Sequence, residues 1–159
     1  MVEFSHLDEK GRSKMVDVTA KKPTVREAVA QGKVFMSRDT AATINREGVP
    51  KGDVFGVARI AGIMAAKKTS DIIPMCHPLE LTDIEIDFSG NVEKGEITIE
   101  ASVKTIGRTG VEMEAMTAVS AAALAIYDMC KSADRGMIVS DIKLIRKCGG
   151  KSGTFAREK

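Results

Sequence analysis

The stretch TDIEIDFSGNVEKGEITIEASV, residues 82–103, decides the fold class because it alternates apolar and polar side chains on either side of a turn-rich centre. Ile84, Ile86 and Phe88 would face one side of a strand, and the acidic residues between them would face the other side. The same alternation recurs over residues 97–103. The pattern predicts an antiparallel hairpin with one buried face.

Two helices are predicted to cover that buried face. The longer helix is expected over residues 111–131, VEMEAMTAVSAAALAIYDMCK, where Thr109 and Glu112 have the spacing of a capping box. The other is expected to begin after Asp53, which has the residue type of an N-cap. Its apolar stripe is predicted to consist of Val57, Ile60, Ala61, Met64 and Ala65.

Weaker patterns complete the prediction. They are a short strand over residues 15–18, a helix start with a capping box over 24–27, a strand over 33–37, a short helix over 40–48 and a last strand over 138–147. Together these elements predict an α+β fold, an antiparallel sheet with helices packed on one face. We expect residues 1–14 to be a mobile N-terminal segment and residues 15–159 to form a single catalytic α+β domain.

Composition excludes several classes of protein. The chain has 159 residues, 43% of them apolar and 29% charged, as expected for one soluble globular domain. A net charge of +2 and the absence of tryptophan give no support to nucleic-acid binding. No apolar run approaches the length that spans a membrane. Three widely spaced cysteines without a C-x-x-C pair indicate free thiols, so we expect a cytoplasmic protein.

The first candidate for chemistry is the run Met75-Cys76-His77-Pro78. Proline keeps the preceding residue extended, so the imidazole of His77 is held in a stiff turn, as a binding or acid–base role requires. A histidine bonded to a neighbouring carbonyl is the plainer alternative, and the run alone favours it. The other histidine, His6, lies in the segment predicted to be mobile.

The second candidate is the long helix. Glu112 fits the capping box, whereas Glu114 either complements the helix dipole or serves a site. Fourteen residues later, Asp128 points within roughly 40° of the direction of Glu114, and Lys131 lies one turn further. An exposed ion pair of little energetic value is the plainer interpretation of Asp128 and Lys131.

Two further candidates are cationic. Adjacent glycines in RKCGGKSG, residues 146–153, can turn backbone amides toward an anion, and Lys147 and Lys151 add charge. The run is not a Walker A loop, since Ile145 stands where that loop needs a glycine. Lys51 precedes a predicted helix start, which suits a phosphate, although a solvated lysine is the plainer alternative.

Five blocks in order, KGDVF…ARIAGI, IPMCHPL, GRTGVEMEAMTA, IYDMCK and GGKSG, give the chain a specific resemblance. It resembles the molybdenum cofactor biosynthesis protein C family, the cyclic pyranopterin monophosphate synthases. The resemblance runs from about residue 15 to residue 153. It implies a ferredoxin-like fold, assembled as a homohexamer of three dimers with sites at subunit interfaces.

The resemblance also implies an activity. The substrate would be the (8S)-3′,8-cyclo-7,8-dihydro form of guanosine triphosphate, and the products cyclic pyranopterin monophosphate and pyrophosphate. Substrate contacts would fall on Met75, Cys76, His77, Met113, Glu114, Lys147 and Lys151. Catalytic roles would fall on Asp128, Lys131, Lys51 and Glu112. No resident cofactor or metal ligand is implied, and a magnesium ion carried by the triphosphate is compatible with the reaction.

The residue types suit that reaction. Opening and rebuilding a purine ring needs positioned proton donors and acceptors, and displacing pyrophosphate needs positive charge around the developing anion. Two other classes stay open. A non-catalytic ferredoxin-like module would bind its ligand without turnover, and a metal-dependent hydrolase built on His77 and Cys76 would carry stoichiometric zinc.

Overall fold

A single antiparallel sheet forms the framework of the protein. The computed structural model describes residues 5–45, 53–151 and 153–158. Within these residues the sheet has five strands in the order β2-β3-β1-β4-β5. The strands are β1 (Thr24–Phe35), β2 (Leu81–Asn91), β3 (Glu96–Gly107), β4 (Ile138–Cys148) and β5 (Phe155–Ala156).

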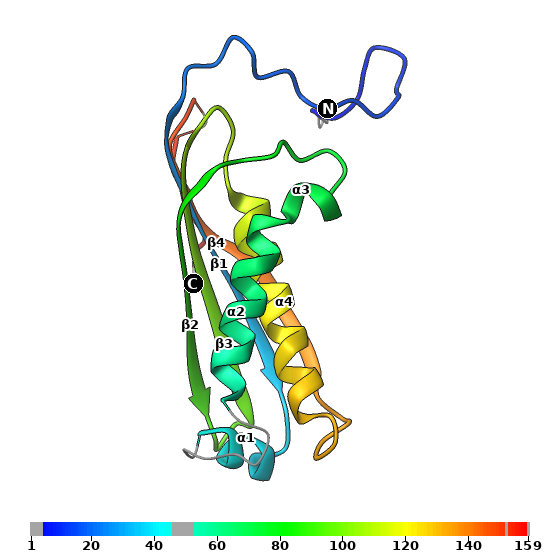
Figure 1. Ribbon diagram of the computed structural model, residues 1–159, viewed down its shortest axis with the longest axis vertical. Helices are drawn as coiled ribbons and strands as arrows, with labels where there is room; N and C mark the ends of the chain where they lie inside the picture. The colour runs from blue at the N-terminus through cyan, green and yellow to red at the C-terminus, as the bar shows by residue number, and fades with distance from the viewer. Residues whose placement is uncertain (1–4, 46–52, 152, 159) are drawn as a thin grey trace.

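The helices of the described chain cover one face of this sheet (Figure 1). They are α1 (Arg38–Asn45), α2 (Val54–Lys67), α3 (Thr69–Ile72) and α4 (Glu112–Cys130). Apart from the short β5, the order of the elements is β-α-β-β-α-β, the connectivity of ferredoxin-like folds. The predicted α+β fold class is therefore confirmed.

The predicted hairpin with one buried face is observed as β2 and β3. Ile86 pairs with Ala101 and Phe88 with Ile99, which brings the apolar faces of β2 and β3 to the same side. The helix-facing side chains of β3 are fully buried. The hairpin therefore supplies the side chains of the core that lie under the helices at this edge of the sheet.

The capping box expected over residues 24–27 is wrong, because this segment is the start of the central strand β1. Alanine and glutamate are good helix formers, which gave the segment a helical appearance. Packing in the folded protein outweighs this local preference for helix. Every second residue from Ala28 to Val34 is buried, as in a strand with one covered face. The strand expected over 33–37 is the end of this same element.

Other local predictions have mixed outcomes. Residues 15–18 do not form a strand. Helix α4 has its N-cap at Val111 with no side-chain capping bond, so the capping box of Thr109 and Glu112 is also wrong. Helix α1 ends at Asn45, and the predicted stop at Gly48 lies outside the described residues. The final strand agrees with β4.

Small residues let α4 lie close to both of its neighbours. A Cβ atom added to Gly32 of β1 would lie 2.6 Å from Cγ1 of Val119. A Cβ atom added to Gly62 of α2 would lie 2.9 Å from the carbonyl oxygen of Ala118. Thr117, Ala118, Ala121 and Ala125 lie on the face of the helix between Glu114 and Asp128, and their small side chains predict the close approach of another backbone. At Ala118 that backbone is α2 of the same chain.

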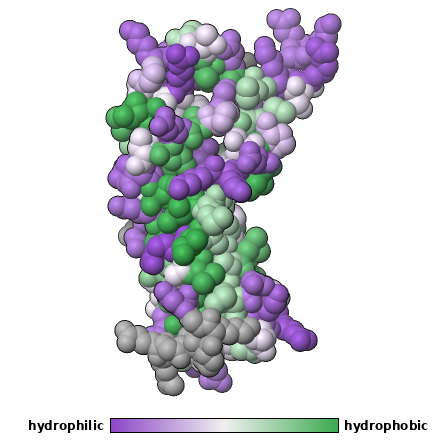
Figure 2. All heavy atoms as spheres, in the orientation of Figure 1, coloured by the Kyte–Doolittle hydropathy of each residue, from purple (hydrophilic) through white to green (hydrophobic). Residues whose placement is uncertain are grey.

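Helix α2 begins as predicted but buries a different face. The side chain of Asp53 accepts a hydrogen bond of 2.8 Å from the amide of Gly56, which confirms the N-cap. The large residues of the predicted apolar stripe, Val57, Ile60 and Met64, point outward and are 45–61% exposed. Its two alanines, Ala61 and Ala65, are half-buried. The core instead takes Val54, Ala58, Gly62 and Ala66. Figure 2 shows the result, a band of hydrophobic side chains along the face that α2 and α4 present.

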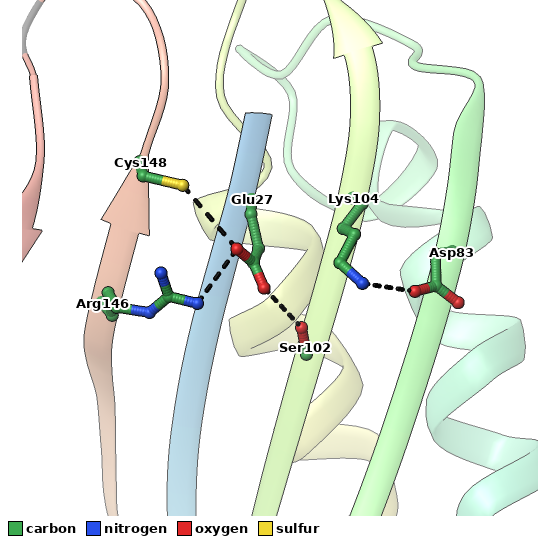
Figure 3. A network of polar contacts seen from close by, with 6 residues as sticks. All are labelled: Glu27, Asp83, Ser102, Lys104, Arg146 and Cys148. Atoms are coloured by element: carbon green, nitrogen blue, oxygen red, sulfur yellow. Dashed lines mark hydrogen bonds and ion pairs between the residues drawn. The ribbon is translucent and has the colours of Figure 1, made fainter. Parts of the chain in front are cut away.

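The opposite face of the sheet is tied together by polar contacts across the strands (Figure 3). Glu27 of β1 forms a 2.9 Å ion pair with Arg146 of β4. It also accepts a 3.4 Å hydrogen bond from the hydroxyl of Ser102 of β3. Lys104 of β3 lies 2.8 Å from Asp83 of β2. These contacts join four neighbouring strands and support their register.

The register of β4 against β1 shifts at two places. The first shift lies beside Asp141, whose φ of 54° is in the left-handed region. The second lies at Ile145, which falls between the residues that pair with β1. Beyond it, Lys147 pairs with Ala28 and so lies on the helix-covered face, whereas Arg146 lies on the open face.

Gly32→Ala is expected to lower the free energy of unfolding by about 1–3 kcal/mol, because its methyl group would overlap Val119 and Ile142 in a packed core. Gly136→Ala is the matched control, since its Cβ would meet only the end of the Asp134 side chain at 3.3 Å. The control should differ from wild type by no more than about 0.5 kcal/mol. Urea denaturation measures both, and equal losses would contradict the close packing of β1 and α4.

Candidate functional site

A cavity of about 550 Å³ lies at the end of the molecule where α3 and the N-terminal segment are found (Figure 1). Three segments line it: the chain after α3, the start of α4 and the N-terminal segment. Six predicted site residues are brought together here, namely Met75, Cys76, His77, Glu112, Met113 and Glu114. The topology, rather than sequence proximity, joins the two motifs.

A tight turn directs the first motif into the cavity. The amide of Cys76 donates to the carbonyl of Ile73 at 3.0 Å, and residues 76–80, between this turn and β2, have no regular hydrogen-bonded structure. The thiol of Cys76 is half-buried, and burial raises its pKa, with a further contribution from the charge of Glu114. The thiol is therefore a neutral, polarisable wall of the cavity.

Glu114 is the most unusual titratable group in the cavity. It belongs to the first turn of α4, yet only 4% of its surface is exposed. Burial raises its pKa to about 7, with a further contribution from the charge of Glu112, while a hydrogen bond with its own backbone opposes the shift. A carboxyl group with this pKa can donate or accept a proton at neutral pH.

Glu112 lies in a different environment. Its Oε1 atom lies 2.7 Å from Nζ of Lys147, which reaches the start of α4 from β4. Both side chains are about 30% exposed, at 27% for Glu112 and 30% for Lys147. Two neighbouring carboxyl groups thus differ in character, because one is paired with a lysine and the other is buried.

The glycine pair of the GGKSG run packs on an arginine that the sequence did not single out. Gly149 and Gly150 have φ of +93° and +77°, and a Cβ on either would overlap Val25 or Arg26. Nε of Arg26 donates to the carbonyl of Gly107 at 3.0 Å. Its Nη2 donates to the carbonyl of Arg108 at 3.2 Å, so Arg26 joins the run to the end of β3 and to the loop before α4. No local sequence signal could reveal this link. Lys151 lies in the turn that follows and is exposed.

The remaining predicted catalytic residues do not reach this cavity within the described chain. Asp128 and Lys131 form an exposed 2.6 Å pair at the far end of α4, where the hydrogen bond to Asp128 raises the pKa of Lys131. The side chain of Asp128 is 70% exposed, whereas Glu114 is buried. The two acids were predicted to point in similar directions from the helix, but they lie in different environments at its two ends. Lys51 lies outside the described residues.

Two general features complete the description of the site. In residues 5–45, 53–151 and 153–158, no three side chains of His, Cys, Asp or Glu gather closely enough to hold a metal ion. Helix α4 is long and apolar enough to cross a membrane by length and composition, but here it packs against the sheet as the core helix.

The sequence model of the MoaC family matches residues 15–150. The chain belongs to this family. Among its relatives is a cyclic pyranopterin monophosphate synthase of Desulfatibacillum aliphaticivorans, 61% identical over 99% of both chains. A synthase of the same name from Heliobacterium modesticaldum is 57% identical over 99% of both chains, and one from Pelotomaculum thermopropionicum is 56% identical over 99% of this chain and 93% of its own length. The predicted family is thus confirmed.

Glu114→Gln is expected to remove a pH dependence of stability. The pKa of Glu114 is raised from 4.5 to about 7 in the folded protein. Below the lower value both states hold the proton, and as pH rises the unfolded chain loses it first, so stability falls. Between about pH 5 and pH 8 the wild-type protein should lose about 1–3 kcal/mol relative to the variant, measured by urea denaturation at each pH. A difference that is constant over this range would contradict the burial of the carboxyl group.

Proposed function

We propose that the protein is a lyase of molybdenum cofactor biosynthesis, a cyclic pyranopterin monophosphate synthase. The observation that carries this proposal is identity of 54–61% over at least 97% of the chain with relatives of that name. The substrate would be (8S)-3′,8-cyclo-7,8-dihydroguanosine 5′-triphosphate. A ribose oxygen attacks the α-phosphorus, the bond to the β-phosphate breaks, and pyrophosphate leaves with the electron pair while the purine is rebuilt as a pyranopterin.

The cavity fits the ring end of such a substrate. Met75, Cys76 and Met113 offer apolar and polarisable walls for a flat heterocycle. Glu114 and His77 offer groups that can exchange protons with ring nitrogens. We assign these five residues to substrate binding, and Lys147, beside Glu112, to the phosphate end together with Lys151.

The catalytic assignment comes from the resemblance to the family, and the charge and basicity of these residues support it. Asp128, Lys131, Lys51 and Glu112 carry the groups that ring opening and phosphate cyclisation require. Asp128 and Lys131 already form an ion pair, with Oδ1 of Asp128 2.6 Å from Nζ of Lys131. A magnesium ion would enter with the triphosphate, whose oxygens are the ligands that it prefers.

The distance along α4 favours a site shared between two chains. Glu114 and Asp128 are fourteen residues apart, roughly 21 Å along the helix axis. One substrate cannot contact both from a single copy of α4. The outward band of Val57, Ile60 and Met64 on α2, with Leu124 on α4, is a hydrophobic surface that a second copy would cover. We therefore propose a dimer with composite sites, and a homohexamer built from three such dimers.

The two alternatives differ in measurable ways. A ligand-binding module would bind the substrate and release no pyrophosphate, and a metal-dependent hydrolase would carry about one zinc ion per chain. Membership of the MoaC family supports the synthase over both. We place the enzyme in the cytoplasm, where its three free thiols would stay reduced.

Asp128→Asn is expected to fold normally and to lower turnover at least about a hundredfold, because it removes the basic group but keeps shape. The assay incubates the cyclised triphosphate with purified protein and measures pyrophosphate and pterin. Glu93→Gln, which removes a carboxylate in the exposed hairpin turn, is the matched control and should retain full activity. Wild-type protein that never releases pyrophosphate would refute the synthase, and an active Asp128→Asn variant would refute only the role of Asp128.

A mixture of Glu114→Ala and Asp128→Asn chains is expected to regain activity after joint dissociation and reassembly. Random pairing makes half of the dimers mixed, and one of the two sites in each mixed dimer contains both intact residues. The expected recovery is therefore about a quarter of wild-type activity. Mixed dimers that are present by mass spectrometry but inactive would place each complete site within one chain.

A further inference from the structure

The N-terminal segment supplies part of the wall of the cavity. Ser5, His6, Val16 and Lys21 line it together with the two motifs of the candidate site. His6 and His77, the only two histidines of the chain, therefore face the same cavity. The residues of this wall have no role in the candidate site as described above.

Residues 6–14 form a compact turn of their own. Oδ1 of Asp8 accepts hydrogen bonds of 2.9 Å from the amides of Lys10 and Arg12. Oδ2 of Asp8 accepts one of 2.8 Å from Nε of Arg12. The amide of Lys14 donates to the carbonyl of His6 at 2.9 Å and closes the turn. His6 is thus held at the base of a defined structure, which reduces the conformational freedom it would lose on binding.

A second turn joins this segment to the body of the protein. The amide of Thr19 donates to Oδ1 of Asp17 at 2.8 Å, and the amide of Lys21 donates to the carbonyl of Val18 at 3.0 Å. Nη1 of Arg108, in the loop before α4, donates to the carbonyl of Thr19 at 3.3 Å. The wall that carries Lys21 is therefore attached to the loop that also borders the cavity.

The charges of this wall complement those of the α4 side. Glu112 and Glu114 are the acidic groups of the cavity, and both come from the first turn of α4. The N-terminal wall brings the cation of Lys21 and the imidazole of His6. One anionic group of a ligand is therefore expected to lie at the N-terminal wall, in addition to the phosphates assigned to Lys147 and Lys151.

We propose that His6 and Lys21 are substrate-binding residues that hold a phosphate group of the nucleotide, and that the turn of residues 6–14 presents His6 to it. The assignment rests on the proposed function for the identity of the substrate. It adds a wall to the site that neither recognised motif contains. Asp8, which does not line the cavity, acts as a positioning residue through the turn.

The test measures binding of guanosine triphosphate by calorimetry at about 0.15 M salt, where exposed charges beyond about 8 Å are screened. His6→Gln and Lys21→Gln should each raise Kd about ten- to a hundredfold, the usual range for one lost hydrogen bond to a charged group. Lys22→Gln removes the same charge from the neighbouring exposed residue, which does not line the cavity, and should change Kd less than about twofold. The proposal would be overturned if Lys21→Gln and Lys22→Gln changed Kd equally. It would also be overturned if neither His6→Gln nor Lys21→Gln changed Kd.

Hydrogen exchange gives a readout that is independent of turnover. The amides within residues 8–14 should exchange more slowly when guanosine triphosphate is bound, and Asp8→Ala should abolish this protection while the core amides of β3 keep theirs. Unchanged exchange in the wild-type protein with bound nucleotide would overturn the role of the turn. If the wild-type protein binds the nucleotide as described but does not turn over the cyclised substrate, the proposed synthase activity is refuted. The assignment of His6 and Lys21 to phosphate binding would then still stand.

Discussion

The close approach of α4 to β1 is the constraint on which the rest of the structure depends. Gly32 leaves no room for even one methyl group beside Val119, so the long helix lies directly on the central strand. This contact fixes the position of both ends of α4. The first end places Glu112 and Glu114 at the cavity, and the other carries Asp128 to the far end of the molecule.

The two acids at the start of α4 illustrate how one turn of helix can serve two chemical tasks. Glu112 meets Lys147 and remains partly exposed, whereas Glu114 is buried beside Cys76. Water stabilises a charged carboxylate far better than a protein interior does, so the buried acid holds its proton to a higher pH. A buried acid beside a second carboxyl group that is paired with a lysine suits a reaction with several proton transfers.

Local periodicity explains what the sequence could predict. The hairpin over residues 82–103, helix α4 and the cap at Asp53 all depend on contacts within a few residues, and all three are observed. β1 could not be predicted in this way, because its alternating small residues are set by the helix above it. The stripe of α2 followed the correct period but has no covering element among the described residues, so the pattern alone could not tell a core face from a surface face.

The candidate site was predictable only in its two motifs. Met75 to His77 and Glu112 to Glu114 have distinctive residue types, and the sheet topology brings them together. The partners from elsewhere, such as Arg26 and His6, have no comparable local signal. Their roles depend on chain segments that meet only after folding, and pairwise contacts of this kind leave no trace in the periodicity of one sequence.

The irregular position in β4 decides which cation lies on which face of the sheet. Leu144 pairs with Ala30 and Arg146 with Val29, so Ile145 is an additional residue that the pairing with β1 passes over. If the same sequence were paired without this irregularity, Ile145 would lie opposite Val29 and Arg146 opposite Ala28. Arg146 would then take the place of Lys147 beside Glu112, and Glu27 would lose its cation on the open face. One surplus residue therefore lets the strand present Arg146 to the polar network and Lys147 to the start of α4.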